Sequence, residues 1–565
     1  MKTLFNSAFV LLSFIIIDNL LVMFSFVAGH AFLPFVLPLS FLLAVLLFLF
    51  IEKNKNKKAT FRTILVSFIV LFVSLGLATF YFDLSWDGQW YQQSAIYHLK
   101  DGWNPLLEPI REFERNNDSS IIHFPKSSWY FAASVYSTTQ IFEAGKSINF
   151  ILLFVAFGLI YQTLQDYGIT KLRSIILTFI VVLNPVVWSE ITTYLVDGLL
   201  VLYLSIYIAM LFAWFKTPHL KILLIGAFAV IGSINVKFTG LVFFGVLAAF
   251  FTIYILFFRR KILIKSFLVH ALVLLAALLL FGYNPYVTNF IERGHPFYPI
   301  MGTKEYPSVF ETTGRDDNEI FETPDNMKGK PLVVRMFYAN FGRPDNAPYF
   351  KEKNAELIWP FTSKVSDWKA YYFHETRVSG FGPYFSAILI LSFVLLLFIL
   401  VSDKQKRWIA LFFTVSLICT LLFSKHFWWP RFAPQTWLIP IIPLFILFLK
   451  RDNKKLNIAS WILAVLFLIN ATIVLVSHLS WETRSSIKLR QQLTEISKQK
   501  VPIEVFYGAF KKSVEEKLTK WNIEFNTAPP REIIQNEHKQ LTSVVEGYPN
   551  MVLYREAETD TSDTN

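Results

Sequence analysis

The stretch TILVSFIVLFVSLGLATFYFDLSWDGQWYQQSAIYHLK, residues 63–100, joins a long apolar run to a segment in which two aspartates lie among tryptophans and tyrosines. The first part, residues 63–82, is long and apolar enough to cross the hydrocarbon core of a bilayer as one helix. Asp83 and Asp87 follow directly after it. A fold built from such spans places both carboxylates at a membrane surface.

Similar apolar runs recur along the chain, which has 565 residues and is 54% hydrophobic and 17% aromatic. A soluble core does not need such runs, whereas a membrane requires them as helices. The first run lacks a small-residue cleavage site and is therefore expected to stay as a span. We predict an all-α polytopic membrane protein with about 13 transmembrane helices. The spans are expected near residues 7–28, 32–51, 63–82, 148–164, 174–189, 195–215, 221–235, 238–257, 266–284, 383–402, 408–424, 434–449 and 456–477.

The basic residues indicate the orientation of these spans. The formal net charge is +12, but the lysines and arginines gather in short loops between the expected helices. With a cytoplasmic N-terminus, every basic cluster falls on the cytoplasmic side, as the positive-inside rule requires. Residues 83–147, 285–382 and the chain from 478 onward are then extracytoplasmic. Since membrane topology explains the positive charge, no nucleic-acid partner is expected.

The chain is expected to divide into four parts. Residues 1–62 form two transmembrane helices and a basic loop, and residues 63–477 form the main membrane core. Residues 478–556 contain a β-like run at 503–507, a helical pattern at 511–521 and a second β-like run at 551–554, which predict a small extracytoplasmic α/β domain. Residues 557–565 are expected to be disordered. The single cysteine, Cys419, excludes an intrachain disulfide and a thiolate metal cluster.

The segment after the third span is predicted to be a helix over residues 83–98. Its aromatic residues then form a stripe suited to the membrane interface. An adjacent polar stripe contains Asp83, Asp87, Tyr91, Ser94 and His98. The aspartates could instead cap the helix N-terminus, where negative charge is favoured. Asp87 lies one turn further in, beside Gly88, which allows another chain or a ligand to approach closely.

Several motifs resemble the polytopic glycosyltransferases of the GT-C superfamily, which take a sugar from a polyprenyl-phosphate carrier. They are WDGQWYQQSAIYHLKDGWNP (86–105), HFPKSSW (123–129), NPYVTNFIERGHPFYP (284–299) and GFGPYFS (380–386). Within that superfamily they are similar to an exopolysaccharide-associated bacterial membrane family. The resemblance covers most of residues 60–450 and implies a bacterial inner-membrane protein. Two spans before the aspartate segment, where the superfamily has one, depart from its usual plan.

Three further motifs supply candidate site residues by the same resemblance. NPVVWSEITTYLVDGLLVLY (184–203) is similar to the superfamily stretch with a second acidic residue, here Asp197, with Glu190 just before it. INVKFTGL (234–241) and WWPRFAPQTWLIPIIP (428–443) contain Lys237 and Arg431. An arginine on the side opposite the basic loops requires a partner, and a carrier-lipid phosphate suits its planar guanidinium. Lysines at this interface can also simply reach lipid headgroups.

The resemblance implies an inverting transfer. Asp87, with Asp83 nearby, acts as general base on an acceptor hydroxyl, and Arg431 with Lys237 or Lys126 neutralises the departing phosphate. The acceptor is a glycan, a lipid or a protein. No cofactor is required, although Asp87 and Asp197 could together hold Mg²⁺ or Mn²⁺. His98, His123 and Tyr91 are weaker candidates for substrate contact.

The sequence is also compatible with functions other than sugar transfer from a lipid carrier. No GxGxxG, Walker or DxD motif appears in a convincing context, which argues against direct use of a nucleotide sugar. A flippase or transporter of lipid-linked glycans would place its function at the midplane, whereas these polar residues gather at the outer face. A lipid-linked oligosaccharide polymerase or ligase, or a scaffold without activity, would equally be a membrane protein with large outer segments.

Overall fold

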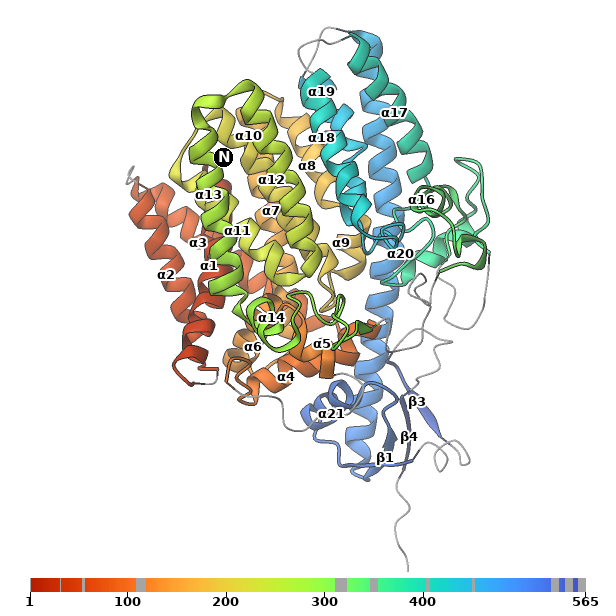
Figure 1. The fold of residues 1–565 in the computed structure, drawn as a ribbon. Coiled ribbons are helices and arrows are strands. Elements are labelled where there is room, and N and C mark those ends of the chain that lie inside the picture. The colour runs from red at the N-terminus through yellow and green to blue at the C-terminus, as the bar shows by residue number, and fades with distance from the viewer. Residues whose placement is uncertain are drawn as a thin grey trace, which may run out of the picture.

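The computed structural model describes residues 2–30, 32–52, 56–107, 118–309, 323–345, 354–402, 407–449, 453–529, 538–543 and 552–556 (Figure 1). The predicted disordered tail at 557–565 lies outside these residues. Helices dominate the described chain, and a small sheet follows them at its end.

The membrane part is built from helices at every position where the sequence predicts a span. Among the described residues, eight helices are long and apolar enough to cross a membrane, judged by length and composition. The predicted fold class, helical and membrane-spanning with a small α/β domain, is confirmed. The elements are α1 (Lys2–Val27), α2 (Val36–Ile51), α3 (Lys57–Phe80), α7 (Ser147–Asp166), α8 (Lys171–Val182), α9 (Pro185–Glu190), α10 (Asp197–Lys216), α11 (Leu220–Val236), α12 (Phe238–Phe258), η3 (Arg260–Ile262), α13 (Leu263–Leu275), η4 (Ala276–Phe281), α17 (Phe385–Ser402), α18 (Arg407–Thr420), η8 (Leu421–Phe423), η9 (Pro434–Leu438), α19 (Ile441–Leu449) and α20 (Lys454–Gln499).

Burial separates central helices from peripheral ones. The most apolar window is 67% buried in α1 and 78% buried in α10, but only 22% buried in α3 and 6% buried in the Arg260–Phe281 helix. The central helices α1, α7, α10 and α11 contribute one continuous hydrophobic core. The peripheral helices expose apolar side chains outward, as expected for surfaces that face lipid.

Two helices differ from the predicted spans. The run at 174–189 is broken, because α8 ends at Val182 and α9 starts at Pro185. The Asn184 side chain caps α9 by accepting a hydrogen bond from the Val186 amide. Pro185 is tolerated in the first turn, because N–H groups there have no partner within the helix and the missing N–H of proline breaks no hydrogen bond. At the other end, α20 runs without interruption to Gln499. The helix therefore continues well past the boundary expected at 478.

The helix predicted over residues 83–98 forms only from Trp86 onward, so the prediction is wrong for residues 83–85. The chain is non-helical up to Ser85, and a π-helical turn, η1 (Gly88–Gln92), precedes α4 (Gln93–Lys100). Asp83 accepts a hydrogen bond from the Ser85 amide at 2.9 Å, which holds the chain in a turn outside the helix. Asp83 therefore does not share a helical stripe with Asp87.

Short helices make up the described parts of the two long segments that connect the spans. The first segment contains η1, α4, α5 (Asp118–His123), α6 (Ser127–Thr139) and η2 (Phe142–Lys146). The second contains η5 (Tyr283–Val287), α14 (Thr288–Arg293), η6 (Asp325–Met327), α16 (Leu332–Phe341) and η7 (Val365–Tyr372). Arg343 pairs with both Glu356 and Asp367 and so connects distant parts of the second segment.

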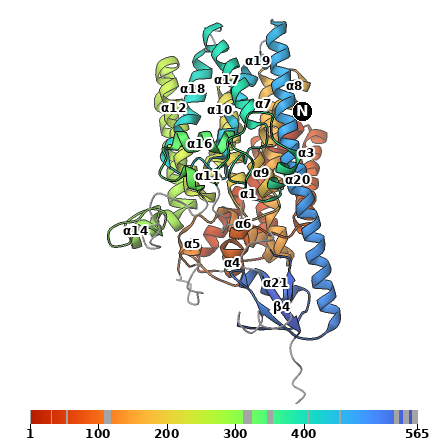
Figure 2. The same ribbon diagram turned by 90° about the vertical axis from the view of Figure 1, so that its right-hand side faces the viewer.

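A small α/β domain follows α20, as the sequence predicts. Its strands β1 (Ile503–Phe506), β2 (Phe525–Thr527), β3 (Lys539–Leu541) and β4 (Val552–Glu556) form one sheet in the order β2-β1-β4-β3. Helix α21 (Lys511–Lys520) connects β1 to the parallel strand β2. The domain lies beside α4, and the Tyr136 hydroxyl of α6 donates to Glu516 of α21 at 2.7 Å (Figure 2).

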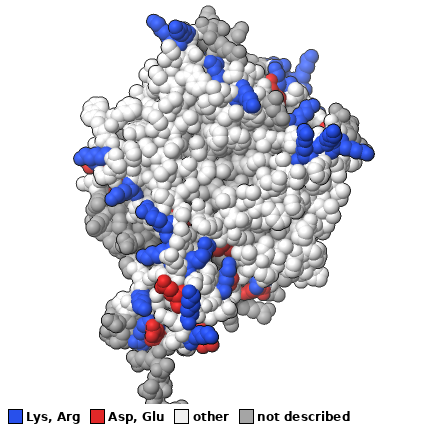
Figure 3. Space-filling view, turned by 180° about the vertical axis from the view of Figure 1, so that it is seen from behind, with Lys and Arg blue, Asp and Glu red and all other residues white. Residues whose placement is uncertain are grey.

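The charge distribution agrees with a membrane-embedded middle. On the face shown in Figure 3, lysines and arginines lie along the upper rim, and mixed charges cover the lower part, where the α/β domain is. A broad uncharged band separates them over most of this face, and basic side chains lie at intermediate height only along its left edge. Such a band is the surface expected for helices surrounded by lipid.

Candidate active site

Arg431 lies at the centre of a cluster of charged side chains. Its guanidinium contacts the Asp87 carboxylate, and its Nε lies 3.1 Å from Asp197 Oδ2. A third contact, from Nη1 to Glu375 Oε2, measures 2.8 Å. The Arg431 side chain is only 11% exposed, and that of Asp87 is 20% exposed. Three carboxylates from distant parts of the chain therefore share one nearly buried cation.

Asp197 connects this arginine to a second cation. The Lys237 ammonium forms an ion pair with the other oxygen of Asp197. Glu190 lies close by, because its Oε2 accepts a hydrogen bond from the Gly198 amide at 2.7 Å. Arg431, Lys237, Asp87, Asp197, Glu190 and Glu375 form what we call the acidic–basic cluster.

Four of the six members lie at the end of a helix, and Glu375 and Arg431 lie in connecting segments. Asp87 precedes η1, Asp197 is the first residue of α10, and Lys237 separates α11 from α12 in an extended conformation. Gly240 permits this sharp break, since a Cβ at that position would meet the Ser233 carbonyl oxygen at 2.0 Å. The cluster therefore lies at the ends of several membrane helices, where the long segments begin.

The cluster contains four carboxyl groups and two cationic side chains, which determines its electrostatics. Burial by itself would lower the pKa of Arg431, but Glu375, Asp87 and Asp197 outweigh this effect and raise it. Burial raises the pKa of Glu190, and the nearby charge of Asp197 adds to this increase. A fully charged cluster would be net negative, and a proton on Glu190 would reduce this excess charge.

Asp83 takes a structural position, contrary to the catalytic role expected beside Asp87. It is fully buried, and its carboxylate accepts hydrogen bonds from the Ser85 hydroxyl at 2.7 Å and from the Tyr194 amide at 2.8 Å. Burial raises the pKa of Asp83, while Lys146 opposes this shift. Gly88 is needed here, because an added Cβ would lie 2.1 Å from Asp83 Oδ2. The close approach expected at Gly88 is thus made by Asp83 itself.

The remaining predicted residues divide between the cluster and its surroundings. Tyr91 is close enough for the charges of Asp87 and Arg431 to affect it, although burial is the main reason why its pKa is raised. Lys126 donates to the Ile122 and Phe124 carbonyls at 2.6 and 2.9 Å. Burial lowers the Lys126 pKa, and the residue is not a partner of Arg431.

The two histidines predicted as candidates also lie outside the contacts of Arg431. His123 Nδ1 is 2.7 Å from Asn289 Oδ1, and its ring contacts Tyr298 edge to face. Burial lowers the pKa of His123 to about 4. His98 lies in the last turn of α4, where its ring contacts Tyr97 edge to face.

Sequence reasoning missed Glu375, which the fold places against Arg431. Glu375 precedes the motif GFGPYFS by a few residues, and this position was the available signal. A small cavity of about 10 Å³ is lined by Arg431, Glu375, His374 and Ser189. This volume is close to that needed by one water molecule. His374, His478 and Glu482, which were also missed, form a buried group beside it.

Comparisons with known proteins give a similarity in structure but none in sequence. No protein-family model and no curated protein sequence matches this chain. Among solved structures, the chain is similar to ArnT from Cupriavidus metallidurans, whose structure is bound to undecaprenyl phosphate. The sequence identity is 13% and the TM-score is 0.41, over 89% of this chain and 99% of that chain.

Proposed function

We propose that the protein is a membrane glycosyltransferase of the GT-C type that moves a sugar from a polyprenyl-phosphate donor to an acceptor hydroxyl. The observation that supports this most directly is the contact of Arg431 with Asp87, Asp197 and Glu375 at the ends of the membrane helices. The motifs that resemble the GT-C superfamily contribute Asp87, Asp197, Lys237 and Arg431, and all four lie in this one cluster.

The cations of the cluster suit a lipid phosphate. Arg431 can present two parallel N–H groups to a phosphate, and Lys237 adds a second positive charge nearby. Both cationic side chains already contact carboxylates, so an incoming phosphate must replace at least one of these carboxylates. We infer that it replaces Asp87, the more exposed of the two aspartates that contact Arg431.

Release from Arg431 would prepare Asp87 for chemistry. Its carboxylate can then accept the proton of the acceptor hydroxyl as the oxygen attacks the anomeric carbon. The bond from that carbon to the phosphate oxygen breaks in the same displacement, which inverts the anomeric centre. The electron pair leaves with the phosphate, where Arg431 and Lys237 stabilise the charge that develops. The products are the glycosylated acceptor and the polyprenyl phosphate.

We propose that this step uses no divalent metal at Asp87 and Asp197. A Mg²⁺ or Mn²⁺ ion at this position would need the carboxylate oxygens that contact Arg431 and Lys237. The guanidinium and ammonium therefore already supply the positive charge, and these residues do not fit a metal as arranged. The acceptor is a hydroxyl on a glycan, a lipid or a protein. Basic-loop topology predicts that the site faces the extracytoplasmic side, and the family resemblance implies that the membrane is a bacterial inner membrane.

The test is mass spectrometry of envelope glycans from a deletion strain complemented with wild type, Arg431→Lys or Arg484→Lys. Lysine keeps the charge but lacks the planar guanidinium that binds a phosphate through two parallel hydrogen bonds, so Arg431→Lys should lack the same sugar as the deletion strain. Arg484 is exposed on α20 and donates to Ser480 of its own helix, so its variant should restore the sugar. Normal glycans from Arg431→Lys would refute the proposal. Accumulation of lipid-linked sugar on the cytoplasmic face would instead identify a transporter.

A further inference from the structure

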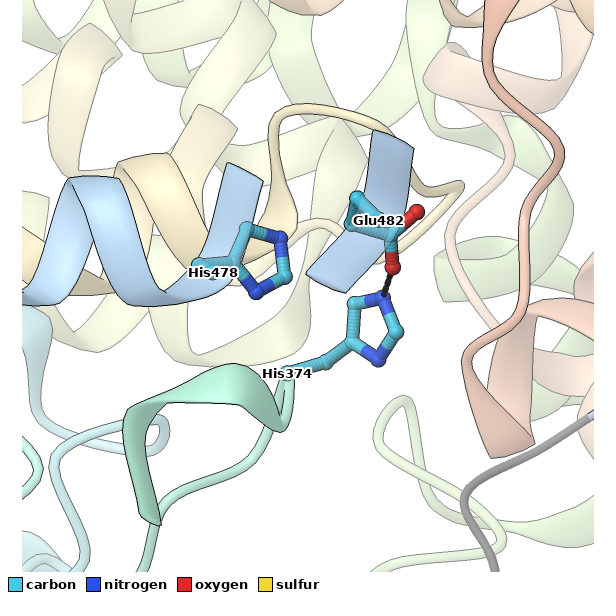
Figure 4. A group of neighbouring side chains, drawn as sticks. All are labelled: His374, His478 and Glu482. Atoms are coloured by element: carbon cyan, nitrogen blue, oxygen red, sulfur yellow. Dashed lines mark ion pairs between the residues drawn. The ribbon is translucent and has the colours of Figure 1, made fainter. Parts of the chain in front are cut away.

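A second buried group lies beside the acidic–basic cluster. His478 and Glu482 lie four residues apart on α20, and His374 reaches them from the segment between η7 and α17 (Figure 4). One ligand atom from each residue lies within 4.8 Å of the other two. His374 Nε2 and Glu482 Oε1 are 2.5 Å apart, and both side chains are 0% exposed.

This group contains polar atoms that hydrogen bonds in the protein do not account for. Within the described part of the chain, His478 Nε2 and His374 Nδ1 are buried without a hydrogen-bond partner. Over the same residues, Glu482 forms no ion pair with a lysine or arginine. A buried polar group without a partner costs free energy, and a buried carboxylate without a cation costs more.

The lysine that affects Glu482 electrostatically, Lys146, is held by other partners. Lys146 affects Glu482 electrostatically, but its ammonium is 2.7 Å from Glu143 Oε2 and donates to the Tyr81 carbonyl at 2.6 Å. Lys146 is itself fully buried, so these two partners hold it in place. Lys146 therefore leaves the buried Glu482 carboxyl without an ion pair to a lysine or arginine among the described residues.

One histidine is already oriented as metal-binding histidines usually are. His478 Nδ1 lies 3.1 Å from the Tyr372 carbonyl oxygen, to which only a protonated nitrogen can donate. This contact leaves the lone pair of His478 Nε2 free, the arrangement that orients imidazole ligands in metal sites. The helix spacing then places Glu482 on the same face of α20, one turn away.

We propose that His374, His478 and Glu482 bind a zinc ion. Two imidazole nitrogens and one carboxylate oxygen form a common zinc ligand set, and zinc takes a fourth ligand in a tetrahedral arrangement. Zinc bonds of about 2.1 Å imply ligand atoms roughly 3.3 Å apart, so the contact between His374 and Glu482 must open slightly. The ion would balance the charge of Glu482 and give the Nε2 lone pair of His478 a partner.

The ion would also support the proposed active site. His374 is followed by Glu375, whose carboxylate is 2.8 Å from Arg431. A metal that joins His374 to α20 would fix the position of Glu375 and, through it, of Arg431. This positioning role rests on the proposed function, whereas zinc binding does not.

The experiment measures zinc in the full-length protein purified in detergent without chelator, then loaded with zinc and desalted. Wild type should retain about one zinc per chain, and His478→Gln and Glu482→Gln should retain almost none. His270→Gln is the matched control, because His270 is a partly buried histidine on α13 that contacts Tyr207 instead. This control should retain zinc as wild type does.

Cobalt provides a second measurement that does not depend on a variant folding. Co²⁺ in a tetrahedral site of wild type should give visible absorption bands that added zinc abolishes, and a chelator should lower the Tm. Absence of stoichiometric zinc and of these bands in wild type would overturn the inference. Zinc binding without any sugar transfer would leave the metal site standing and remove only its positioning role.

Discussion

Replacement of Asp87 by asparagine should separate binding of the lipid phosphate from turnover. The ion pair between Asp87 and Arg431 holds the guanidinium that we assign to the phosphate. Asparagine has nearly the same shape but no charge, so it competes less strongly for Arg431. The variant should therefore bind polyprenyl phosphate at least as tightly as wild type and transfer sugar far more slowly.

The contacts set the size of both effects. A hydrogen bond between charged groups contributes about 1.5–3 kcal/mol when buried. Asp87 is one-fifth exposed, so solvent screening reduces this to about 1–2 kcal/mol, which corresponds to a roughly 5- to 30-fold gain in phosphate affinity. Loss of a general base typically lowers kcat by about 10²–10⁴.

The assay uses protein in lipid nanodiscs. Binding of undecaprenyl phosphate is measured by native mass spectrometry, and transfer is measured with a labelled polyprenyl-phosphate sugar. Asp101→Asn is the control, because Asp101 is an exposed carboxylate that pairs with Lys100 at 3.4 Å. It should change neither quantity. Weaker phosphate binding by Asp87→Asn, or turnover within about threefold of wild type, would refute the reasoning.

Two further predictions concern the surroundings of the site. Gly88→Ala should lower both Tm and activity, because the new methyl group would meet Asp83 at 2.1 Å. Thermal unfolding is measured beside the control Gly245→Ala, since a methyl group at Gly245 has open space around it. An unchanged Tm of Gly88→Ala would contradict the prediction. Burial lowers the pKa of His123 to about 4 in the fold, whereas in the unfolded chain it is about 6.5. The residue therefore does not affect stability well above pH 6.5, and it destabilises the fold increasingly as the pH falls toward 4. At pH 5 the protonated unfolded form should cost the fold about 2 kcal/mol. His123→Gln should therefore lose less Tm than wild type between pH 7 and pH 5, and an equal loss in both proteins would show that another group causes the acid sensitivity.

The local sequence determined the membrane helices and part of the small C-terminal domain, in which it did not predict β2 and β3. Apolar runs long enough for a bilayer must form helices there, because lipid offers no partners to an open backbone. In the same way, the β-like run at 503–507 forms β1, and the helical pattern at 511–521 forms α21. These helices and strands depend on residues that are close together in the chain, so they can be predicted from one sequence.

The partners of each charged side chain were decided only by the tertiary structure. Asp83 and Asp87 look equivalent in the sequence, yet the fold buries the first against Ser85 and Tyr194 and presents the second to Arg431. Glu375 meets Arg431, and His374 meets His478 and Glu482, across more than 50 residues of chain, so the local sequence shows neither meeting. Electrostatic partnership depends on distance in space, and packing of the helices sets that distance.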